Sequence, residues 1–340
     1  MTTETMRAAT ARRYGGPEVM AIEALAVPQP GPGQVLVRVE AFGVTRGDAR
    51  IRGLDVPRGM GLGVRLAFGL RRPRRVVPGR EFAGIVTGLG AGVQGWAPGE
   101  AVLGITDGMQ LGAGAEYLCV SASGLLARRP AGMAATEAAG TLFGLMTAAD
   151  FLRDQAGLQP GERVLVNGAT GAVGVAALQV AALTGARVTA LCSPANHDLA
   201  RALGAETVAD YRAGLPAGPF DLVLDIAGTL PWRRALPLLA PGGRLALVTA
   251  DLAGQLGALL RPRRGGRRLV AGIVKENPAA LARALDLWAQ GCRPVITALP
   301  FAQIVEAHRR ASGGHKRGAV VVTMGSADAT EGRESLDQPE

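Results

Sequence analysis

The residues with the clearest chemical meaning are three glycines in the run Gly168-Ala-Thr-Gly171-Ala-Val-Gly174. They follow a short apolar run and precede an Ala- and Val-rich segment that predicts a helix. Glycines in this setting let the backbone approach a pyrophosphate, whose charge the helix N-terminus stabilises. The context predicts a dinucleotide site, and a structural glycine-rich turn is the alternative. The expected site residues here are Gly168, Thr170, Gly171, Ala172, Val173 and Gly174.

The residue after the next predicted strand bears on the choice of nucleotide. That strand ends at Cys192, and Ser193 follows it, nineteen residues past Gly174. An acidic residue here would accept hydrogen bonds from the ribose 2′-hydroxyl of NADH and would repel the 2′-phosphate of NADPH. Serine does not repel that phosphate and can donate to it. We therefore expect NADPH, with NADH less favoured. The further donors expected nearby are Asn196 and Tyr211.

The cysteines and histidines form no pattern that would hold a metal. The three cysteines lie far apart in the sequence, and so do the three histidines. Zinc needs three or four nitrogen, sulfur or oxygen ligands in a tetrahedral arrangement. We expect no metal site and, because the cysteine count is odd and sparse, no disulfide framework. These residues are Cys119, Cys192, Cys292, His197, His308 and His315.

The charge of the chain is distributed unevenly. The formal net charge is +9, but residues 326–340 hold five acids and one base, so they carry −4 and leave +13 on the remainder. A basic body is typical either of a protein with an anionic partner or of a solvated basic surface. Residues 326–340 have almost no apolar content, and we expect them to form a disordered tail.

Two stretches hold several arginines each. The first, Leu62 to Arg75, is an apolar run followed by arginines, which is typical of a lid, of a docking surface for anionic membranes, or of a packed loop with a solvated end. The second, Arg261 to Arg268, has few aromatic residues nearby. We interpret it as a solvated turn and expect no nucleic-acid partner.

No segment marks the chain for export. Met1 to Arg13 is polar and lacks the apolar core of a signal peptide. Val164 to Ala186 is uncharged over more than 20 residues, but its four glycines divide it into a strand, a turn and a helix rather than a membrane span. We expect a cytoplasmic protein.

The elements that must position these residues are of two kinds. In the first third, Val35, Val37 and Val39 alternate with other residues, and frequent Gly and Pro predict short strands in a small barrel. From Val164 onward strands alternate with helices, which predicts a parallel sheet covered on both faces, and hence an α/β fold. The later strands are expected at 187–192, 221–225, 244–248, near 295 and at 319–323, and the helices at 196–203, 231–239, 278–290 and 301–311.

Five longer motifs occur along the chain in a fixed order. They are Arg13-Tyr-Gly-Gly-Pro-Glu-Val-Met20, Gly43-Val-Thr-Arg-Gly-Asp48, Pro78-Gly-Arg-Glu-Phe-Ala-Gly84, Pro241-Gly-Gly-Arg244 and Gly314-His-Lys-Arg-Gly318. In this order the chain resembles the quinone oxidoreductases of the medium-chain dehydrogenase/reductase superfamily. The resemblance implies a GroES-like β-barrel substrate domain from residues 1–126 and 277–325, a Rossmann NADP-binding domain from residues 127–276, and a homodimer.

The resemblance also bears on zinc. Zinc alcohol dehydrogenases of this superfamily carry cysteine where Thr45 stands and histidine where Arg80 stands, and their four-cysteine zinc lobe has no counterpart here. The resemblance thus implies a zinc-independent member. Quinone oxidoreductases usually have Asn in place of Thr45, tyrosines near Arg50 and Lys in place of Ala319, and these departures leave the acceptor open.

Three residues are candidates for catalysis in the cleft between the two domains. The resemblance places Thr45 and Asp48 at this cleft, although Asp48 is equally suited to orienting its loop. Lys275 belongs to a segment that resembles one lining the cleft, where it could bind phosphate or donate a proton. A solvated surface lysine is the alternative.

Further cofactor contacts follow from strand position and from the resemblance. Thr249 comes just after the carboxyl end of a predicted strand, where open α/β sheets bind ligands. Thr147 resembles the family threonine near the nicotinamide, and Asn277 lies in the segment that resembles a cleft wall. Tyr211 is expected to pack on the 2′-phosphate, with a loop cap as the alternative.

The expected chemistry follows from the missing Lewis acid. Without one, nothing obvious stabilises the alkoxide of an unactivated alcohol. A quinone or an α,β-unsaturated carbonyl delocalises the developing charge, so the enzyme mainly has to hold nicotinamide C4 near the acceptor carbon. We expect an NADPH-dependent reductase of quinones, enones or enals. The alternatives are a tailoring enoyl reductase of a bacterial biosynthetic pathway and an NADPH-binding regulator that docks on membrane or nucleic acid.

Overall fold

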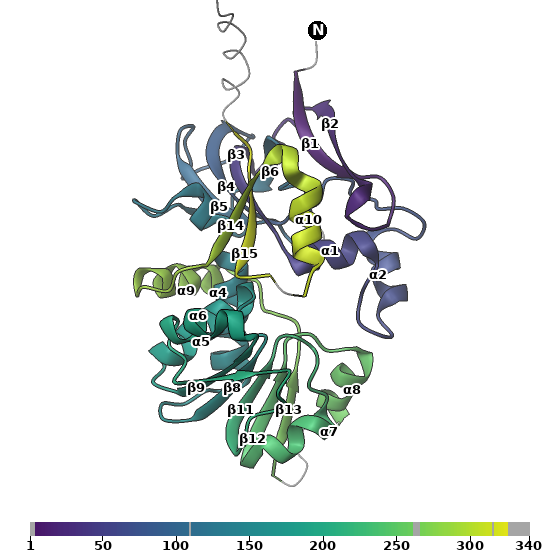
Figure 1. Ribbon diagram of the computed structural model, residues 1–340. Helices are drawn as coiled ribbons and strands as arrows, with labels where there is room; N and C mark the ends of the chain where they lie inside the picture. Colours follow the sequence, from purple (N-terminus) through teal and green to yellow (C-terminus); the bar gives the residue numbers. More distant parts are fainter. Residues whose placement is uncertain (1–3, 109, 261–265, 315, 326–340) are drawn as a thin grey trace, which may run out of the picture.

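The computed structural model describes residues 4–108, 110–260, 266–314 and 316–325. Figure 1 shows two lobes stacked one above the other, each built around its own large β-sheet. The expected tail, residues 326–340, lies outside the described residues.

The lower lobe contains a six-stranded parallel sheet with the order β10-β9-β8-β11-β12-β13. The chain runs outward from β8 to β10 on one side and from β11 to β13 on the other, so the strand order reverses between β8 and β11. In such sheets ligands bind outside the carboxyl ends of the strands at this reversal. The strands are β8 (Arg163–Asn167), β9 (Arg187–Cys192), β10 (Thr207–Asp210), β11 (Phe220–Asp225), β12 (Leu239–Leu247) and β13 (Arg268–Ala271).

Both faces of this sheet are buried because alternate residues of each strand point to opposite sides. Val164 and Val166 of β8 join the core on the side of α4, α5 and α9, whereas Leu165 joins the core formed with α7 and α8. The helices of this lobe are α4 (Leu142–Ala149), which continues as a π-helical turn (Asp150–Gln155), α5 (Ala172–Leu183), α6 (His197–Ala202), α7 (Trp232–Ala235) and α8 (Leu252–Leu260).

The upper lobe is mostly antiparallel, with the strand order β14-β15-β3-β4-β5-β7 and with β6 paired to β3. Its last two strands come from the end of the chain, and Val320 of β15 pairs with Val44 of β3. Phe42 and Phe82 fill the centre of its core. The strands are β3 (Gln34–Val44), β4 (Glu81–Leu89), β5 (Ala101–Ile105), β6 (Tyr117–Ser121), β7 (Leu126–Arg128), β14 (Ile296–Pro300) and β15 (Ala319–Thr323), beside a separate hairpin of β1 (Thr5–Ala11) and β2 (Met20–Ala26).

Helices surround the junction of the two lobes (Figure 1). Short 3-10 turns link several elements, at Pro17–Val19, Pro194–Asn196, Leu236–Leu238 and Phe301–Gln303. The helices that complete the upper lobe and the junction are α1 (Arg46–Gly53), α2 (Gly61–Phe68), α3 (Ala135–Ala138), α9 (Pro278–Ala289) and α10 (Ile304–Ser312).

The expected α/β fold, with a GroES-like domain and a Rossmann domain, is confirmed. Three details differ from the sequence expectation. The helix expected at 231–239 is a single α-turn, α7, followed by a 3-10 turn around Pro237, which has no N–H to continue an α-helix. The strand expected at 244–248 begins earlier, at Leu239. The proposed domain boundary after residue 126 falls inside β7, which pairs with β5 of the upper sheet.

Candidate active site

A cavity of about 580 Å³ lies between the two lobes. One wall comes from the loops after β8, β9 and β11, at the strand-order reversal. The opposite wall comes from the end of β3, the start of α1 and the segment that leads into β15. The cavity therefore brings the glycine turn and the Thr45 region into one site.

Two of the three motif glycines are required by close packing. Gly168 has φ +83°, and a Cβ there would lie 3.1 Å from the backbone nitrogen of Ala227. A Cβ on Gly174 would lie 2.2 Å from the carbonyl oxygen of Gly168. Gly174 does not line the cavity, so its part is to let α5 pack against the turn rather than to touch a ligand.

Gly171 has the opposite surroundings, because a Cβ there would meet nothing nearer than Gly168 O at 3.9 Å. It is the N-cap of α5 and offers no side-chain acceptor to the first N–H groups of the helix. Gly171, Ala172 and Val173 line the cavity. Free N–H groups and an open backbone suit a phosphate at a helix N-terminus, so these residues fit a dinucleotide.

A hydrogen-bonded group stands at the end of β9. The Asn196 amide donates to Thr170 Oγ1 and to Ser193 Oγ, each at 3.2 Å. Asn196 is buried, whereas Tyr211 stands at the cavity edge with 42% of its surface exposed. Asn196, Thr170, Ser193 and Tyr211 all line the cavity. Asn196 also fixes the positions of the Thr170 and Ser193 hydroxyl groups.

The loop after β11 is held by a buried carboxylate that sequence reasoning missed. Asp225 accepts hydrogen bonds from the Asn167 amide at 2.7 Å and from the backbone N–H groups of Gly228 and Leu230. The same amide donates to Thr229 Oγ1 at 2.8 Å. Asp225 ends the strand expected at 221–225, but only the strand pairing shows that it faces Asn167.

Thr45 and Asp48 form a capping box at the start of α1. The Thr45 backbone N–H and hydroxyl donate to Asp48 Oδ2 at 2.8 and 2.6 Å, and the Asp48 N–H donates to Thr45 Oγ1. Asp48 Oδ1 accepts from the Gly79 N–H at 3.2 Å. Thr45 lines the cavity and the buried Asp48 does not. This geometry favours the loop-orienting alternative for Asp48.

Glu81 is a titratable residue of the cavity that sequence reasoning missed. Its Oε1 accepts hydrogen bonds from the N–H groups of Leu142 and Phe143, at 2.6 and 3.2 Å, at the start of α4. Burial disfavours the carboxylate more strongly than these donors favour it, and raises the pKa of Glu81 to about 8. The side chain is therefore largely protonated at neutral pH and can donate a proton into the cavity.

Lys316 reaches the cavity from the segment before β15. Burial lowers the pKa of its ammonium group to about 8, while the charges of Asp48 and Glu81 oppose that shift. Two residues further on, the Gly318 N–H donates to the carbonyl of Thr170 at 2.8 Å, which ties this segment to the glycine turn. The sequence motif contained Lys316, but nothing local showed that it faces Glu81 and Asp48.

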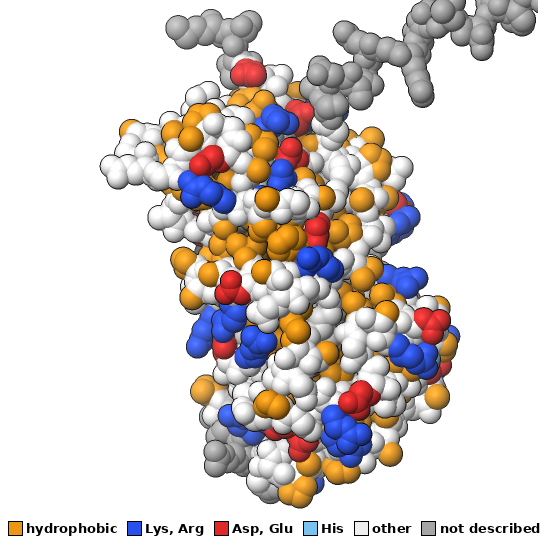
Figure 2. Space-filling model, turned by 90° about the vertical axis from the view of Figure 1, so that its left-hand side faces the viewer, with side chains coloured by type: hydrophobic (Ala, Val, Ile, Leu, Met, Phe, Trp, Pro, Cys, Tyr) orange, Lys and Arg blue, Asp and Glu red, His pale blue; other side chains and the backbone are white. Residues whose placement is uncertain are grey.

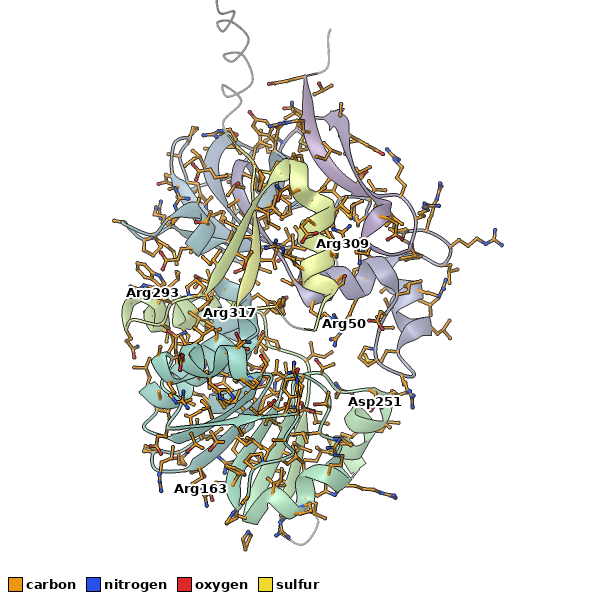
Figure 3. All side chains as sticks on the ribbon, in the orientation of Figure 1. Arg50, Arg163, Asp251, Arg293, Arg309 and Arg317 are labelled. Atoms are coloured by element: carbon orange, nitrogen blue, oxygen red, sulfur yellow. The ribbon has the colours of Figure 1, made fainter. Side chains whose placement is uncertain are left out.

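Two arginines at the start of α1 complete the upper wall. Arg46 and Arg50 both line the cavity. Arg50 extends from α1 toward the lower lobe, where its Nη1 lies 3.4 Å from Thr249 Oγ1 (Figure 3). Burial lowers the pKa of Arg50, and the nearby charge of Arg46 lowers it further.

Four other expected site residues do not line the cavity. Thr147 is buried in α4, one turn beyond the cavity residues Phe143 and Gly144. Thr249 is partly buried and reaches the site only through Arg50. Lys275 is exposed, which fits the solvated alternative, and Asn277 caps α9 by accepting from the Ala280 N–H.

Arg80 forms a bidentate ion pair across the two lobes. Its guanidinium donates to both carboxylate oxygens of Glu276, at 3.0 and 2.6 Å, and to the carbonyl of Thr106. Within the described ranges, no three His, Cys, Asp or Glu side chains gather as metal ligands would.

The stretch from Leu62 to Arg75 forms α2 and a loop. Leu62, Leu66 and Leu70 are exposed, and Tyr14 holds the loop by donating to the carbonyl of Gly69 at 2.6 Å. In Figure 1 the helix stands beside the junction of the lobes, opposite α8. Its role as lid, docking surface or packed loop stays open.

Figure 2 shows the face that carries α9 and β14, where hydrophobic side chains gather at the waist between the lobes and charged groups lie mainly above and below. Among the described helices, none is long and apolar enough to cross a membrane.

Two family models match the chain. The alcohol dehydrogenase GroES-like domain matches residues 31–139, and the zinc-binding dehydrogenase family matches residues 203–322.

Individual relatives agree with these matches. A chloroplastic quinone-oxidoreductase, QR1 of Triphysaria versicolor, is 29% identical over 95% of this chain and 99% of its own. The mitochondrial NAD(P)H oxidoreductase RTN4IP1 of Danio rerio is 28% identical over 86% of this chain and 84% of its own. The spectinabilin polyketide synthase protein NorB of Streptomyces orinoci is 33% identical over 86% of this chain, which spans 13% of that relative.

The fold is shared with a solved structure, the quinone oxidoreductase from Coxiella burnetii, with a TM-score of 0.84, 24% identity and coverage of 94% of this chain and 100% of that one. The chain belongs to the medium-chain dehydrogenase/reductase superfamily and is similar to the quinone oxidoreductases.

Proposed function

We propose that this protein transfers hydride from NADPH to a quinone or an α,β-unsaturated carbonyl compound without the help of zinc. The observation that carries the proposal is a single cavity that joins the glycine turn to a substrate wall whose two expected zinc positions hold Thr45 and Arg80.

The residues at those two positions do not fit zinc. Arg80 is a cation that is already paired with Glu276 and the Thr106 carbonyl, so it offers no lone pair and would repel a metal ion. The hydroxyl of Thr45 is engaged by Asp48 in both directions. One matching family is described as zinc-binding, so a metal analysis belongs in the test.

The preference for NADPH rests on Ser193. The residue follows β9 directly and lines the cavity. Its hydroxyl and that of Thr170 accept hydrogen bonds from the same Asn196 amide. Among the described lining residues the single carboxyl is Glu81, which belongs to the other wall. A 2′-phosphate at the end of β9 would therefore meet hydroxyl and amide groups rather than an acid.

When bound, the dinucleotide supplies a hydride, which is two electrons and one proton, to the β-carbon of the acceptor. The acceptor π electrons move to its oxygen, and one further proton completes the reduction. Glu81 is protonated at neutral pH and lines the cavity, so we assign it as the source of that proton. Lys316, with a pKa lowered to about 8, is placed to return a proton to Glu81.

An acceptor screen with NADPH and NADH in parallel tests the function. Oxidation of either nucleotide is followed with quinones, enones and enals, and the same sample is analysed for zinc. We expect turnover with NADPH in protein free of zinc. Tight NADPH binding without turnover of any acceptor would leave the regulator alternative, which binding to anionic vesicles or RNA at two salt concentrations would then test.

A second candidate is an enoyl reductase that tailors a biosynthetic product. The 33% identity to NorB, a polyketide synthase system protein, favours it. The chemistry is the same, and the acceptor is an enoyl thioester. A 2-enoyl thioester turned over faster than every quinone and enal would select this candidate.

Two structural expectations remain proposals. We propose the substrate domain to be residues 1–128 together with 277–325, which keeps β7 whole, and a homodimer as the assembly. Sedimentation velocity tests the second point directly, since a monomer at micromolar concentration would reject it.

A further inference from the structure

The charged groups of the cavity are unevenly balanced. Among the described lining residues four are cationic and one, Glu81, is a carboxyl that is largely protonated at neutral pH. Three of the four cations come from segments of the substrate lobe, two from the start of α1 and one from the segment that Gly318 ties to the glycine turn. These three are Arg46, Arg50 and Lys316.

Arg50 is the least compensated of the three. It is partly buried, and its one described polar contact is the neutral hydroxyl of Thr249, at 3.4 Å. Within the described part of the chain, no carboxylate forms an ion pair with it; burial and the charge of Arg46 lower the pKa of Arg50, and the charge of Asp55 opposes this only in part. A partly buried cation without an ion-pair partner loses hydration that an anion can replace, so this arrangement favours binding of an anion.

The neighbouring groups do not remove this imbalance. Arg46 contacts the carbonyl of Ser312 and lies 3.6 Å from Asp55, whose side chain is 79% exposed. Asp48 is the acid whose charge most strongly raises the pKa of Lys316, and it already accepts hydrogen bonds from Thr45 and Gly79. The cations of this wall are therefore available to a ligand.

The cofactor does not account for these charges. Its pyrophosphate is expected at the N-terminus of α5, and its 2′-phosphate at Ser193, both on the opposite wall. Arg50 lines the cavity on the wall opposite to both expected phosphate positions.

We propose that the acceptor carries an anionic group, a carboxylate or phosphate, which Arg50 binds with support from Arg46 and Lys316. Arg50 spans from α1 to Thr249 of the lower lobe, so an anion bound to it is held between the two lobes. This inference rests on the proposed reductase function and narrows its substrate class to anionic enones, enals or quinones.

Matched acceptors test the proposal. Cinnamaldehyde, 4-carboxycinnamaldehyde and its 4-phosphate counterpart share the reacting enal and differ in charge. Because hydrogen bonds to a charged group are strong, we expect kcat/KM for an anionic acceptor to exceed that for cinnamaldehyde by about tenfold or more. The two anionic compounds separate carboxylate from phosphate as the preferred group.

The variant Arg50→Gln should lower kcat/KM for the anionic acceptors about tenfold more than kcat/KM for cinnamaldehyde, and so remove the preference. Arg50→Lys should keep part of the preference, because the charge remains. Arg71→Gln, an exposed arginine outside the cavity, is the matched control and should change nothing.

Three results would overturn the proposal. The first is that Arg50→Gln lowers kcat/KM equally for neutral and anionic acceptors, and the second is that Arg50→Gln binds NADPH more weakly. The third is a higher kcat/KM of the wild type for cinnamaldehyde than for the anionic acceptors. Turnover of cinnamaldehyde alone would retain the reductase function and reject the anionic substrate. If no acceptor is reduced, calorimetry with benzoate and benzamide on the NADP⁺-loaded protein still decides, since only the benzoate affinity should fall in Arg50→Gln.

Discussion

The two walls of the cavity offer a ligand different kinds of group. The lower wall uses backbone groups and neutral side chains, with the open Gly171, the start of α5 and the hydroxyl of Ser193. The upper wall uses ionisable side chains, Glu81 and Arg50 among them, which come from separate segments. The difference indicates that the lower wall is shaped for one invariant ligand, whereas the upper wall is adapted to a particular acceptor.

The strongest way to break the lower wall is to fill the space at Gly174. The Cβ of Gly174→Val would lie 2.2 Å from Gly168 O, so the turn must move, and we expect NADPH binding to be lost. Fluorescence titration measures this loss, and circular dichroism checks that the variant is folded. Gly63→Ala is the control, because a Cβ at Gly63 meets nothing within 4 Å. Normal affinity in Gly174→Val would show that the turn does not bind the nucleotide.

On the upper wall, Glu81→Gln removes the proposed proton source and keeps the shape of the side chain. We expect kcat to fall about 100-fold with NADPH affinity unchanged, in line with loss of a general acid. The wild-type rate should decline as the pH rises through about 8, where Glu81 loses its proton. An unchanged rate and pH profile in the variant would assign the proton to water or to Lys316.

The distinction between the two nucleotides depends on one position of the lower wall. Ser193→Asp places a carboxylate at the end of β9, where it would repel a 2′-phosphate. We expect NADPH to bind about tenfold more weakly and NADH to bind about as well as before. Ser193→Ala is the control for loss of the hydroxyl alone. Equal weakening of both nucleotides by the aspartate would show that Ser193 does not face the 2′ position.

The smallest expected effect concerns stability. The pKa of Glu81 is about 8 in the folded protein and 4.5 in the unfolded reference, so the folded state binds more protons between these values. Stability contributed by this protonation is complete below pH 4.5 and is lost as the pH rises through about 8. The Tm of Glu81→Gln relative to the wild type should therefore increase from pH 5 to pH 8, as differential scanning calorimetry would show. If the Tm difference between Glu81→Gln and the wild type does not vary with pH, the pKa of Glu81 is not raised by folding.

Lys316 acts in the opposite direction over a different range. Its pKa is about 8 in the folded protein and 10.5 in the reference, so its contribution strengthens as the pH rises between these values. Measurements for Glu81→Gln should thus stop at pH 8.

The lower wall could be predicted from sequence because its signals are local. A strand, the glycine turn and a helix lie within some twenty consecutive residues, and Ser193 follows the next strand directly. The upper wall could not be predicted in this way. Glu81 and Lys316 become neighbours only when β15 pairs with β3 and β3 pairs with β4, and no local pattern records their burial. Thr147 and Asn277 were expected near the ligand from the resemblance; in the structure Thr147 is buried in α4 and Asn277 caps α9.

The pairing of Val44 with Val320 has a consequence for synthesis. The strands β8 to β13 can assemble once residue 271 has left the ribosome, whereas the open edge of β3 at residues 41–44 must wait for the last strand. We expect the lower lobe to form first and the exposed edge to need protection until β15 has left the ribosome. Pulse proteolysis of nascent chains stalled near residue 310 and of the released chain would show this order as a protease-resistant lower lobe in the stalled chain.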